Sequence, residues 1–146
     1  MEVRVYYEDT DAGGVVYYAN YLRYLERGRT EFVRARGVSL QDLLDLGYQF
    51  PVARLEIDYR FPAVYDDLIR ITTTVLEVGN ASFTLGHQVL RVADNKLLTE
   101  AQVTLACIGP GNRVRRLPAE LSRILQGGRP ETGQEKQVDA GGGETQ

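Results

Sequence analysis

Residues 6–21 read YYEDTDAGGVVYYANY, and we expect the rest of the chain to be arranged around this stretch. It begins as a strand, breaks at an acidic turn, passes the pair Gly13-Gly14 and then enters a long amphipathic helix. A helix start offers unpaired N–H groups that polarise a carbonyl, and a carboxylate beside it can take a proton from water or attack directly. The same residue types also suit a plain strand-to-helix corner. The local pattern therefore leaves a hydrolytic site and a structural corner as alternatives.

The bulk composition limits the class of protein. The chain has 146 residues, of which 43% are hydrophobic and 25% charged, as expected of one globular domain. A net charge of −3 gives no basic surface for nucleic acid. One cysteine excludes an internal disulfide and fits a reducing compartment. No apolar run suggests a membrane span, and the N-terminus enters a strand without a signal peptide. We therefore expect a cytoplasmic protein with neither membrane span nor nucleic-acid partner.

The single histidine, His87, limits the chemistry. Any mechanism that needs two histidines, and any histidine-rich metal site, is excluded within one chain. His87 falls on the apolar side of a predicted strand, which favours a satisfied core or interface histidine. Cys107 lies in another apolar strand, which favours a buried, inert thiol. We expect no metal and no cofactor, so the chemistry falls to carboxylates, tyrosines, backbone groups and arginine.

Hydrophobic spacing predicts one long helix followed by a run of strands. Apolar residues recur at helical spacing over 18–36. Gly28 interrupts this helix at a cost of about 1 kcal/mol relative to alanine, so we expect another backbone to approach closely there. The other predicted elements are strand 3–7, a short helix opened by Ser39 and closed by Gly47, strands 53–61, 68–78, 83–92 and 97–108 with a hairpin turn at Asp94-Asn95, and a short helix starting at Pro118.

The order of these elements indicates an α+β domain at residues 1–126. After Gly127 the chain holds no aromatic residue and is rich in glycine, so we expect 127–146 to be a disordered tail. The strand predicted at 97–108 carries apolar residues on both faces. We expect it to form a free sheet edge that pairs with a second copy, which makes the chain a homodimer.

The opening motif resembles a known family. Residues 5–21, together with Leu25-Glu26-Arg27 and the turn Tyr65-Asp66-Asp67-Leu68, look like hot-dog-fold acyl-CoA thioesterases of the 4-hydroxybenzoyl-CoA thioesterase type, and closest to the branch encoded beside the Tol-Pal envelope system. The resemblance covers about residues 3–125. It implies an antiparallel sheet wrapped around one long helix, edge-to-edge dimers that can pair into tetramers, and active sites at the dimer interface.

The resemblance also implies residue roles. Asp11 matches the catalytic carboxylate, as base or nucleophile, and the backbone N–H of Tyr18 matches the group that polarises the thioester carbonyl. Asp9 is the structural member of the acidic pair, because its side chain can accept backbone N–H groups of the turn. The remaining candidates contact substrate: Gly13 and Gly14 by close backbone approach, and Asn80, Ser82 and Phe83 at the pantetheine or nucleotide. A hairpin turn is the alternative for these last three.

Two departures from the family pattern bear on the substrate. Many members of the Tol-Pal branch carry histidine where this chain has Tyr18, so substrate preference does not carry over from them. The turn at 79–82 has no positive charge, whereas the 4-hydroxybenzoyl-CoA enzymes have basic residues there that meet nucleotide phosphates. This departure leaves three alternatives: weak affinity for free CoA, CoA binding by another basic residue, or an acyl group carried on acyl carrier protein.

Three functions follow from this comparison. The first is a thioesterase that hydrolyses short-chain, fatty or aromatic acyl-CoA, or acyl carrier protein esters. The second is a hot-dog protein that binds acyl thioesters or a partner without turning them over. The third, a hot-dog dehydratase or hydratase, uses a histidine with a carboxylate, and His87 lies far along the chain from Asp11.

Overall fold

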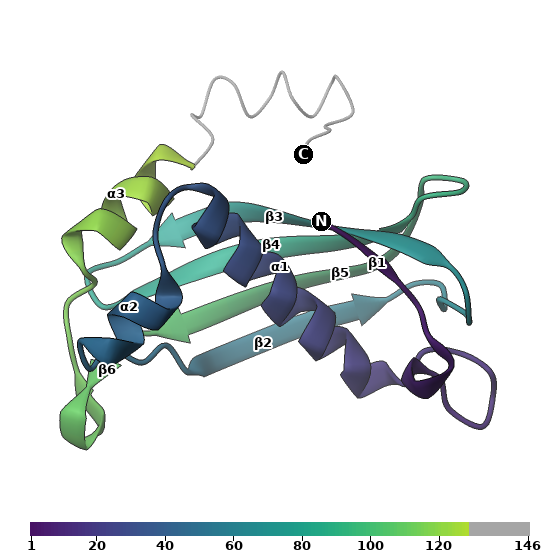
Figure 1. Ribbon diagram of the computed structural model, residues 1–146, viewed down its shortest axis with the longest axis horizontal. Helices are drawn as coiled ribbons and strands as arrows, with labels where there is room; N and C mark the ends of the chain where they lie inside the picture. The colour runs from purple at the N-terminus through teal and green to yellow at the C-terminus, as the bar shows by residue number, and fades with distance from the viewer. Residues whose placement is uncertain (129–146) are drawn as a thin grey trace.

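The computed structural model describes residues 1–128, which form one antiparallel sheet packed against a long helix (Figure 1). The sheet has five strands in the order β1-β3-β4-β5-β2. The elements are β1 (Glu2–Arg4), α1 (Tyr21–Ala35), α2 (Leu40–Asp45), β2 (Val52–Tyr59), β3 (Leu68–Val78), β4 (Ser82–Arg91), β5 (Lys96–Ala106), β6 (Ile108–Gly109), β7 (Arg113–Val114) and α3 (Ala119–Gly127), with short 3₁₀ turns at Tyr7–Asp9, Tyr18–Asn20 and Pro110–Asn112. The predicted α+β class is confirmed.

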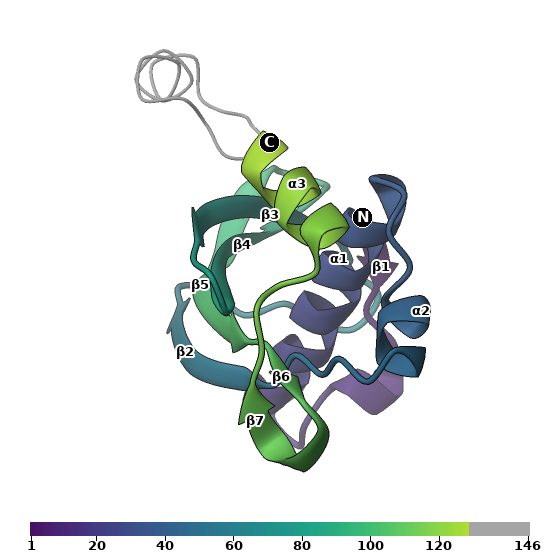
Figure 2. The ribbon, with the colours of Figure 1, turned by 90° about the vertical axis from the view of Figure 1, so that its left-hand side faces the viewer.

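The three long strands β3, β4 and β5 form the centre of the sheet as consecutive antiparallel neighbours. The predicted turn between β4 and β5 is present: Asn95 takes a positive φ of 58°, and the Asp94 carboxylate accepts the N–H of Lys96 at 3.2 Å. Alternate residues of these strands point into the core, as the two-residue period requires. Figure 2 shows the sheet curving around α1.

Helix α1 lies directly on the sheet at Gly28. A Cβ built on Gly28 would come within 2.6 Å of Cγ2 of Ile71 on β3, which is closer than packed carbon atoms allow. The prediction that another backbone approaches at this glycine is wrong, because the atoms nearest to the added Cβ belong to the side chains of Ile71 and Thr73. Tyr21, Tyr24 and Leu25 share the buried side of the helix.

Strand β5 is an inner strand, and the prediction that it forms a free edge is wrong. It lies between β4 and β2, and its apolar residues on both faces accompany this interior position. The edges are β1, which has three residues, and β2, which has eight. The sequence predicted that the apolar residues of 53–61 share one side of a half-buried strand. Within this chain, only Leu55 and Ile57 on that side are half-buried, whereas Tyr59 and Phe61 are exposed.

Smaller differences concern the element ends. The first strand stops at Arg4 rather than Tyr7, because residues 7–9 wind into a 3₁₀ turn closed by the Asp9 side chain. The long helix begins with a 3₁₀ turn at 18–20. The loop predicted at 109–112 is the turn of an unpredicted hairpin, β6–β7.

The chain is described as far as Gly128. Gly127, placed in the tail by composition, is the last residue of α3. The rest of the predicted tail, 129–146, lies outside the described residues. Within residues 1–128, no helix is long and apolar enough to cross a membrane.

The contact at Gly28 gives a direct test of the packing. We expect Gly28→Ala to lower the free energy of unfolding by about 1–3 kcal/mol, because the added methyl forces α1 away from β3, even though alanine favours the helix. Gly127→Ala is the matched control, since a Cβ there meets no atom within 4 Å. Urea unfolding measures both. A Gly28→Ala protein as stable as wild type would show that α1 is not pressed onto the sheet.

Candidate active site

The loop at residues 10–16 holds the Asp11 side chain at the surface. A bridge between Thr10 and Val16 closes the loop, and the N–H of Asp11 donates to the carbonyl of Val15 at 2.9 Å. Oδ1 of Asp11 accepts the N–H of Gly13 at 2.8 Å, and Oδ2 accepts no hydrogen bond within residues 1–128. The carboxylate is therefore held by one oxygen and free at the other.

The two glycines of this loop serve the turn in different ways. Gly14 has a φ of 83°, which other residues adopt rarely. A Cβ on Gly13 would lie 3.2 Å from Oδ1 of Asp11. A side chain at either position would strain the turn or crowd the carboxylate, so the glycines keep both the backbone and Asp11 accessible.

The start of the long helix offers free backbone donors. The N–H of Tyr17 donates to the carbonyl of Asp9 at 2.9 Å, and the N–H of Asn20 donates to the carbonyl of Tyr17 at 2.8 Å. The intervening N–H groups of Tyr18 and Ala19 donate to no acceptor in the part of the chain that the structure describes. Because helix starts carry partial positive charge, these two groups suit a carbonyl oxygen that gains negative charge.

Asp9 is bonded on both oxygens. Oδ2 accepts the N–H of Tyr6 at 2.8 Å, and Oδ1 accepts from Nδ2 of the buried Asn20 at 3.1 Å. The predicted bond from the Asp9 side chain to a backbone N–H of the turn is present. The buried phenol of Tyr24 lies close by, and burial, together with the nearby Asp9 charge, raises its pKa above the ordinary value.

Tyr59 ties this region to the edge strand, and the sequence did not single it out. Its hydroxyl donates to the carbonyl of Tyr18 at 2.9 Å, and its ring contacts those of Tyr18 and Tyr21 with centroids 6.4 and 5.4 Å apart. The only feature of the sequence that could have indicated its role is its position on the apolar side of strand 53–61. The contact fixes the first turn before α1 against the end of β2.

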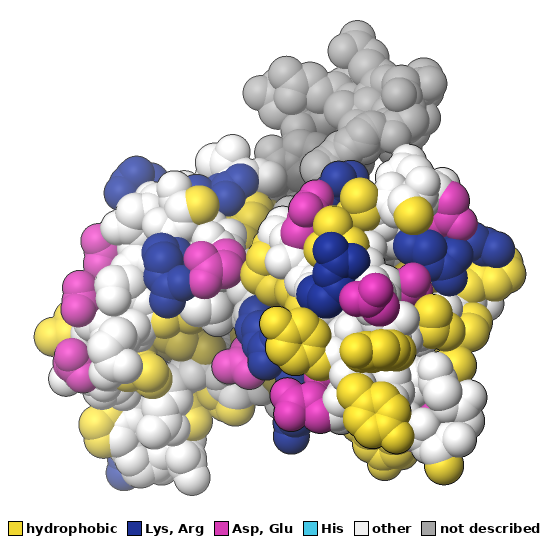
Figure 3. Space-filling view, turned by 45° about the vertical axis from the view of Figure 1, so that its right-hand side comes forward, with side chains coloured by type: hydrophobic (Ala, Val, Ile, Leu, Met, Phe, Trp, Pro, Cys, Tyr) yellow, Lys and Arg dark blue, Asp and Glu magenta, His cyan; other side chains and the backbone are white. Residues whose placement is uncertain are grey.

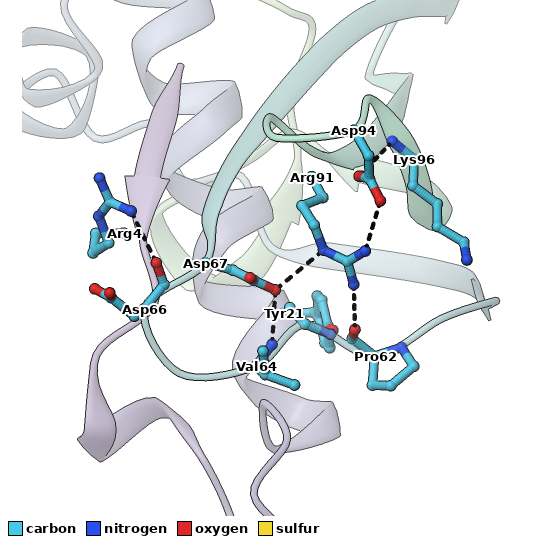
Figure 4. Close-up of polar contacts among 10 residues, drawn as sticks. Arg4, Tyr21, Pro62, Val64, Asp66, Asp67, Arg91, Asp94 and Lys96 are labelled. Carbon is cyan, nitrogen blue, oxygen red and sulfur yellow. Dashed lines mark hydrogen bonds and ion pairs between the residues drawn. The ribbon is translucent and has the colours of Figure 1, made fainter.

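A polar network behind the loop anchors the turn at 62–67 (Figure 4). Oδ2 of Asp67 accepts the N–H of Val64 at 3.0 Å and Nε of Arg91 at 3.3 Å. Arg91 also donates to the Asp94 carboxylate at 3.0 Å and to the carbonyl of Pro62 at 3.2 Å. A bridge between Val15 and Val64 then joins this turn to the Asp11 loop. The turn at 62–67, which contains the Tyr65-Asp66-Asp67 segment of the family resemblance, thus holds the Asp11 loop in place through this bridge.

Aromatic side chains cover the surface around the loop. Of the six tyrosines in or just beyond the opening motif, only Tyr21 and Tyr24 lie in the core. The exposed aromatic residues near the loop and the end of β2 are Tyr6, Tyr7, Tyr17, Tyr18, Tyr59, Phe61 and Tyr65. Figure 3 shows hydrophobic side chains gathered on the side of the molecule that it presents. Exposed apolar surface of this extent is typical of an interaction site.

The remaining substrate candidates lie at the other end of the sheet. Ser82 begins β4, whereas Arg91 at its far end contacts the turn beneath the Asp11 loop. The carbonyl of Asn80 accepts the N–H of Leu117 at 2.8 Å, and Phe83 is buried. Within one chain, the structure therefore does not bring Asn80, Ser82 and Phe83 together with Asp11.

Phe83 instead lines a cavity of about 210 Å³ between the sheet and helices α1 and α2. Its wall is mostly apolar, with a polar part from α1, and it consists of Glu26, Arg29, Thr30, Val33, Leu40, Leu44, Phe50, Phe83, Leu85, Leu105 and Leu121. Burial lowers the pKa of Arg29 from its ordinary value. An apolar chain suits this lining.

His87 and Cys107 are both buried, as expected. His87 is 2% exposed, with Nδ1 3.2 Å from Oγ1 of Thr73. It is not fully satisfied, because Nε2 has no partner among the described residues, and burial, with the charge of Arg29, lowers its pKa to about 4. Cys107 is buried, which raises its thiol pKa. Residues 1–128 contain no cluster of three potential metal ligands.

Comparisons with known proteins identify the family to which the chain belongs. A family model described as the thioesterase-like superfamily matches residues 5–125. Acyl-CoA thioester hydrolase YbgC of Escherichia coli is 42% identical over 120 residues, 82% of this chain and 89% of that protein. Acyl-CoA thioesterase YbgC of Haemophilus influenzae is 44% identical over 110 residues, 75% and 79% of the two chains.

Among solved structures, a probable thioesterase from Bartonella henselae is 36% identical, with a TM-score of 0.72 over 81% of this chain and 96% of that one. The hot-dog fold that the sequence predicted is confirmed by this likeness. With the family model spanning nearly all of the described residues, the chain belongs to the thioesterase-like superfamily.

Proposed function

We propose that this protein hydrolyses acyl-CoA thioesters, so that water and the thioester give a carboxylic acid and a free thiol. One observation carries the proposal: the exposed Asp11 carboxylate is anchored by a single N–H on the loop that leads to the unpaired N–H groups of Tyr18 and Ala19. The carboxylate supplies a base or a nucleophile, and the N–H groups stabilise the negative charge on the carbonyl oxygen.

The names of the relatives support CoA as the carrier, since the Escherichia coli and Haemophilus influenzae proteins are an acyl-CoA thioester hydrolase and an acyl-CoA thioesterase. Acyl carrier protein remains a second carrier that the same chemistry would serve. A cytoplasmic location remains a prediction from composition, and a connection with the Tol-Pal system remains a prediction from the resemblance.

The assembly that suits this site is a homodimer formed through β2. An eight-residue strand with one unpaired edge invites pairing, whereas β1 offers only three residues. Tyr59 and Phe61 at the end of β2 are 45% and 46% exposed, so a second copy would cover them. Two such dimers would make the tetramer that the resemblance allows.

The alternative is a protein that binds acyl thioesters or a partner without turnover. The absence of positive charge at 79–82 favours it, because CoA then lacks the basic turn that family members use. The accessible Asp11 carboxylate favours hydrolysis, since a binding protein has no need of a free carboxylate beside a thioester.

The two aspartates should differ in their effect on stability. We expect Asp9→Ala to lower the free energy of unfolding by about 2 kcal/mol, because it leaves the buried Asn20 amide without its acceptor. Asp11→Ala should cost less than about 1 kcal/mol, because only an exposed bond to Gly13 is lost. Urea unfolding at pH 7 measures both. Equal losses would make Asp11 a residue of the fold rather than of the chemistry.

Thiol release from a panel of short, long and aromatic acyl-CoAs tests the function. We expect wild type to hydrolyse at least one ester, and Asp11→Asn to lose about 10²-fold or more in kcat, the scale of general-base catalysis. Glu8→Gln is the matched control, since Glu8 is an exposed carboxylate near the same loop without a hydrogen bond or ion pair in residues 1–128. A wild-type protein silent on every ester would favour the binding protein, and a fully active Asp11→Asn would refute the role of Asp11.

A further inference from the structure

The free N–H groups of Tyr18 and Ala19 lie in a surface turn of 3₁₀ type, whose hydrogen bonds have poorer geometry than those of an α-helix. Two backbone bonds fix the flanking groups, since the N–H of Tyr17 donates to Asp9 and the N–H of Asn20 donates to Tyr17. Neither bond involves the peptide group that joins Tyr18 to Ala19. A donor that stabilises an oxyanion must point in a fixed direction before the reaction begins. A further support for this peptide group would therefore favour hydrolysis.

The hydroxyl of Tyr59 supplies such a support, because it donates to the carbonyl oxygen of Tyr18 at 2.9 Å. The carbonyl of Tyr18 and the N–H of Ala19 belong to one planar trans peptide unit, so they point in opposite directions. A bond that fixes the carbonyl also fixes the direction of the N–H. It polarises the peptide group as well, since hydrogen bonds in a chain strengthen one another. The N–H of Ala19 thereby becomes a better donor.

The backbone that carries Tyr59 is held by the sheet. Tyr59 is the last residue of β2 and lies opposite Thr99 of the inner strand β5. Directly after it, the N–H groups of Arg60 and Phe61 donate to the carbonyl of Leu98 at 2.8 and 3.2 Å. Figure 1 shows this end of β2 close to the start of α1. The sheet, and not the turn itself, therefore sets the position of the hydroxyl.

The aromatic neighbours of Tyr59 hold its ring and keep its hydroxyl protonated. The ring lies 6.4 Å from that of Tyr18 and 5.4 Å from that of Tyr21, between centroids. Tyr21 is 2% exposed, and its hydroxyl accepts the N–H of Ala63 at 3.2 Å. Burial, together with the phenols of Tyr21 and Tyr18, raises the pKa of Tyr59 above its ordinary value. The phenol therefore remains a hydrogen-bond donor at neutral pH.

We propose that Tyr59 is a positioning residue for the hydrolysis: its hydroxyl holds the peptide group between Tyr18 and Ala19 so that the Ala19 N–H faces the carbonyl oxygen of the ester. The inference rests on the proposed function. Tyr59 touches no reacting atom in this arrangement and acts only through the backbone of the turn. Loss of the hydroxyl should slow the reaction more than it weakens substrate binding, because the N–H matters most when the oxygen carries negative charge.

The variant Tyr59→Phe removes the hydroxyl and keeps the ring. We expect kcat for the best acyl-CoA ester to fall about tenfold, the effect of one hydrogen bond, with KM within about twofold of the wild-type value. Tyr48→Phe is the matched control, because the Tyr48 hydroxyl makes no hydrogen bond within residues 1–128 and its ring lies against Phe50 and Arg115. A Tyr59→Phe protein with wild-type kcat, or with a change in KM alone, would overturn the proposal.

Packing of the Tyr59 ring is the competing explanation, and Tyr59→Leu tests it by removing both the ring and the hydroxyl. If packing alone supports the turn, Tyr59→Phe stays as active as wild type and only Tyr59→Leu loses activity, which would contradict the proposal. We expect instead that Tyr59→Phe already shows most of the loss in kcat. Its urea midpoint should stay near that of wild type, because the bond that it loses is exposed.

NMR of the protein without substrate tests the hydrogen bond itself and needs no turnover. The amide nitrogen of Ala19 and the carbonyl carbon of Tyr18 should change chemical shift in Tyr59→Phe and keep the wild-type values in Tyr48→Phe. Unchanged signals in Tyr59→Phe would overturn the proposal whatever the activity. A wild type silent on every ester would refute the proposed function and this inference with it, whereas an active wild type matched by Tyr59→Phe would refute this inference alone.

Discussion

The seating of α1 on β3 is the constraint on which the rest of the structure depends. Gly28 is the glycine of α1, and a side chain there would collide with the sheet, since a Cβ would lie 2.6 Å from Ile71. Tyr24 and Tyr21, one and two turns before Gly28, bury their rings in the same core, and the unpaired N–H groups of Tyr18 and Ala19 lie just before this buried stretch, at the edge of the core.

The two carboxylates of the opening motif have different roles in the site that we propose. Asp9 has both oxygens bonded and connects the turn before the loop, at Tyr6, with the buried Asn20 after it. Asp11 keeps one oxygen free at the surface. A loop that presents one free carboxylate suits chemistry on a bound ester. In a single chain, however, the aromatic side chains around this loop are exposed to water. The homodimer that we propose, paired along β2, would enclose them.

The parts of this account that depend on nearby residues could be predicted from the sequence. Turn chemistry identified Asp94-Asn95, helical spacing identified α1, and the resemblance identified the family. The glycine in α1 indicated a crowded position, but not that a side chain of β3 fills it. Strand order could not be predicted, because apolar residues on both faces suit an inner strand as well as an edge, and only the return of β2 onto β5 decides between them. The β6–β7 hairpin is too short for a periodic signal and depends on the distant contact between Arg115 and Tyr48.

The central claim is that Asp11 performs chemistry on the bound ester and is not needed to bind it. The most direct measurement is the Kd of a thioether analogue of acyl-CoA, which cannot be hydrolysed, for wild type and Asp11→Asn by calorimetry. The account predicts values within about threefold of each other, because the Asp11 carboxylate accepts a hydrogen bond from the N–H of Gly13 in its own loop and acts on the reaction rather than on the binding of the ligand. If the affinity falls by as much as the turnover, Asp11 is a binding residue, and the hydrolytic carboxylate must be sought elsewhere.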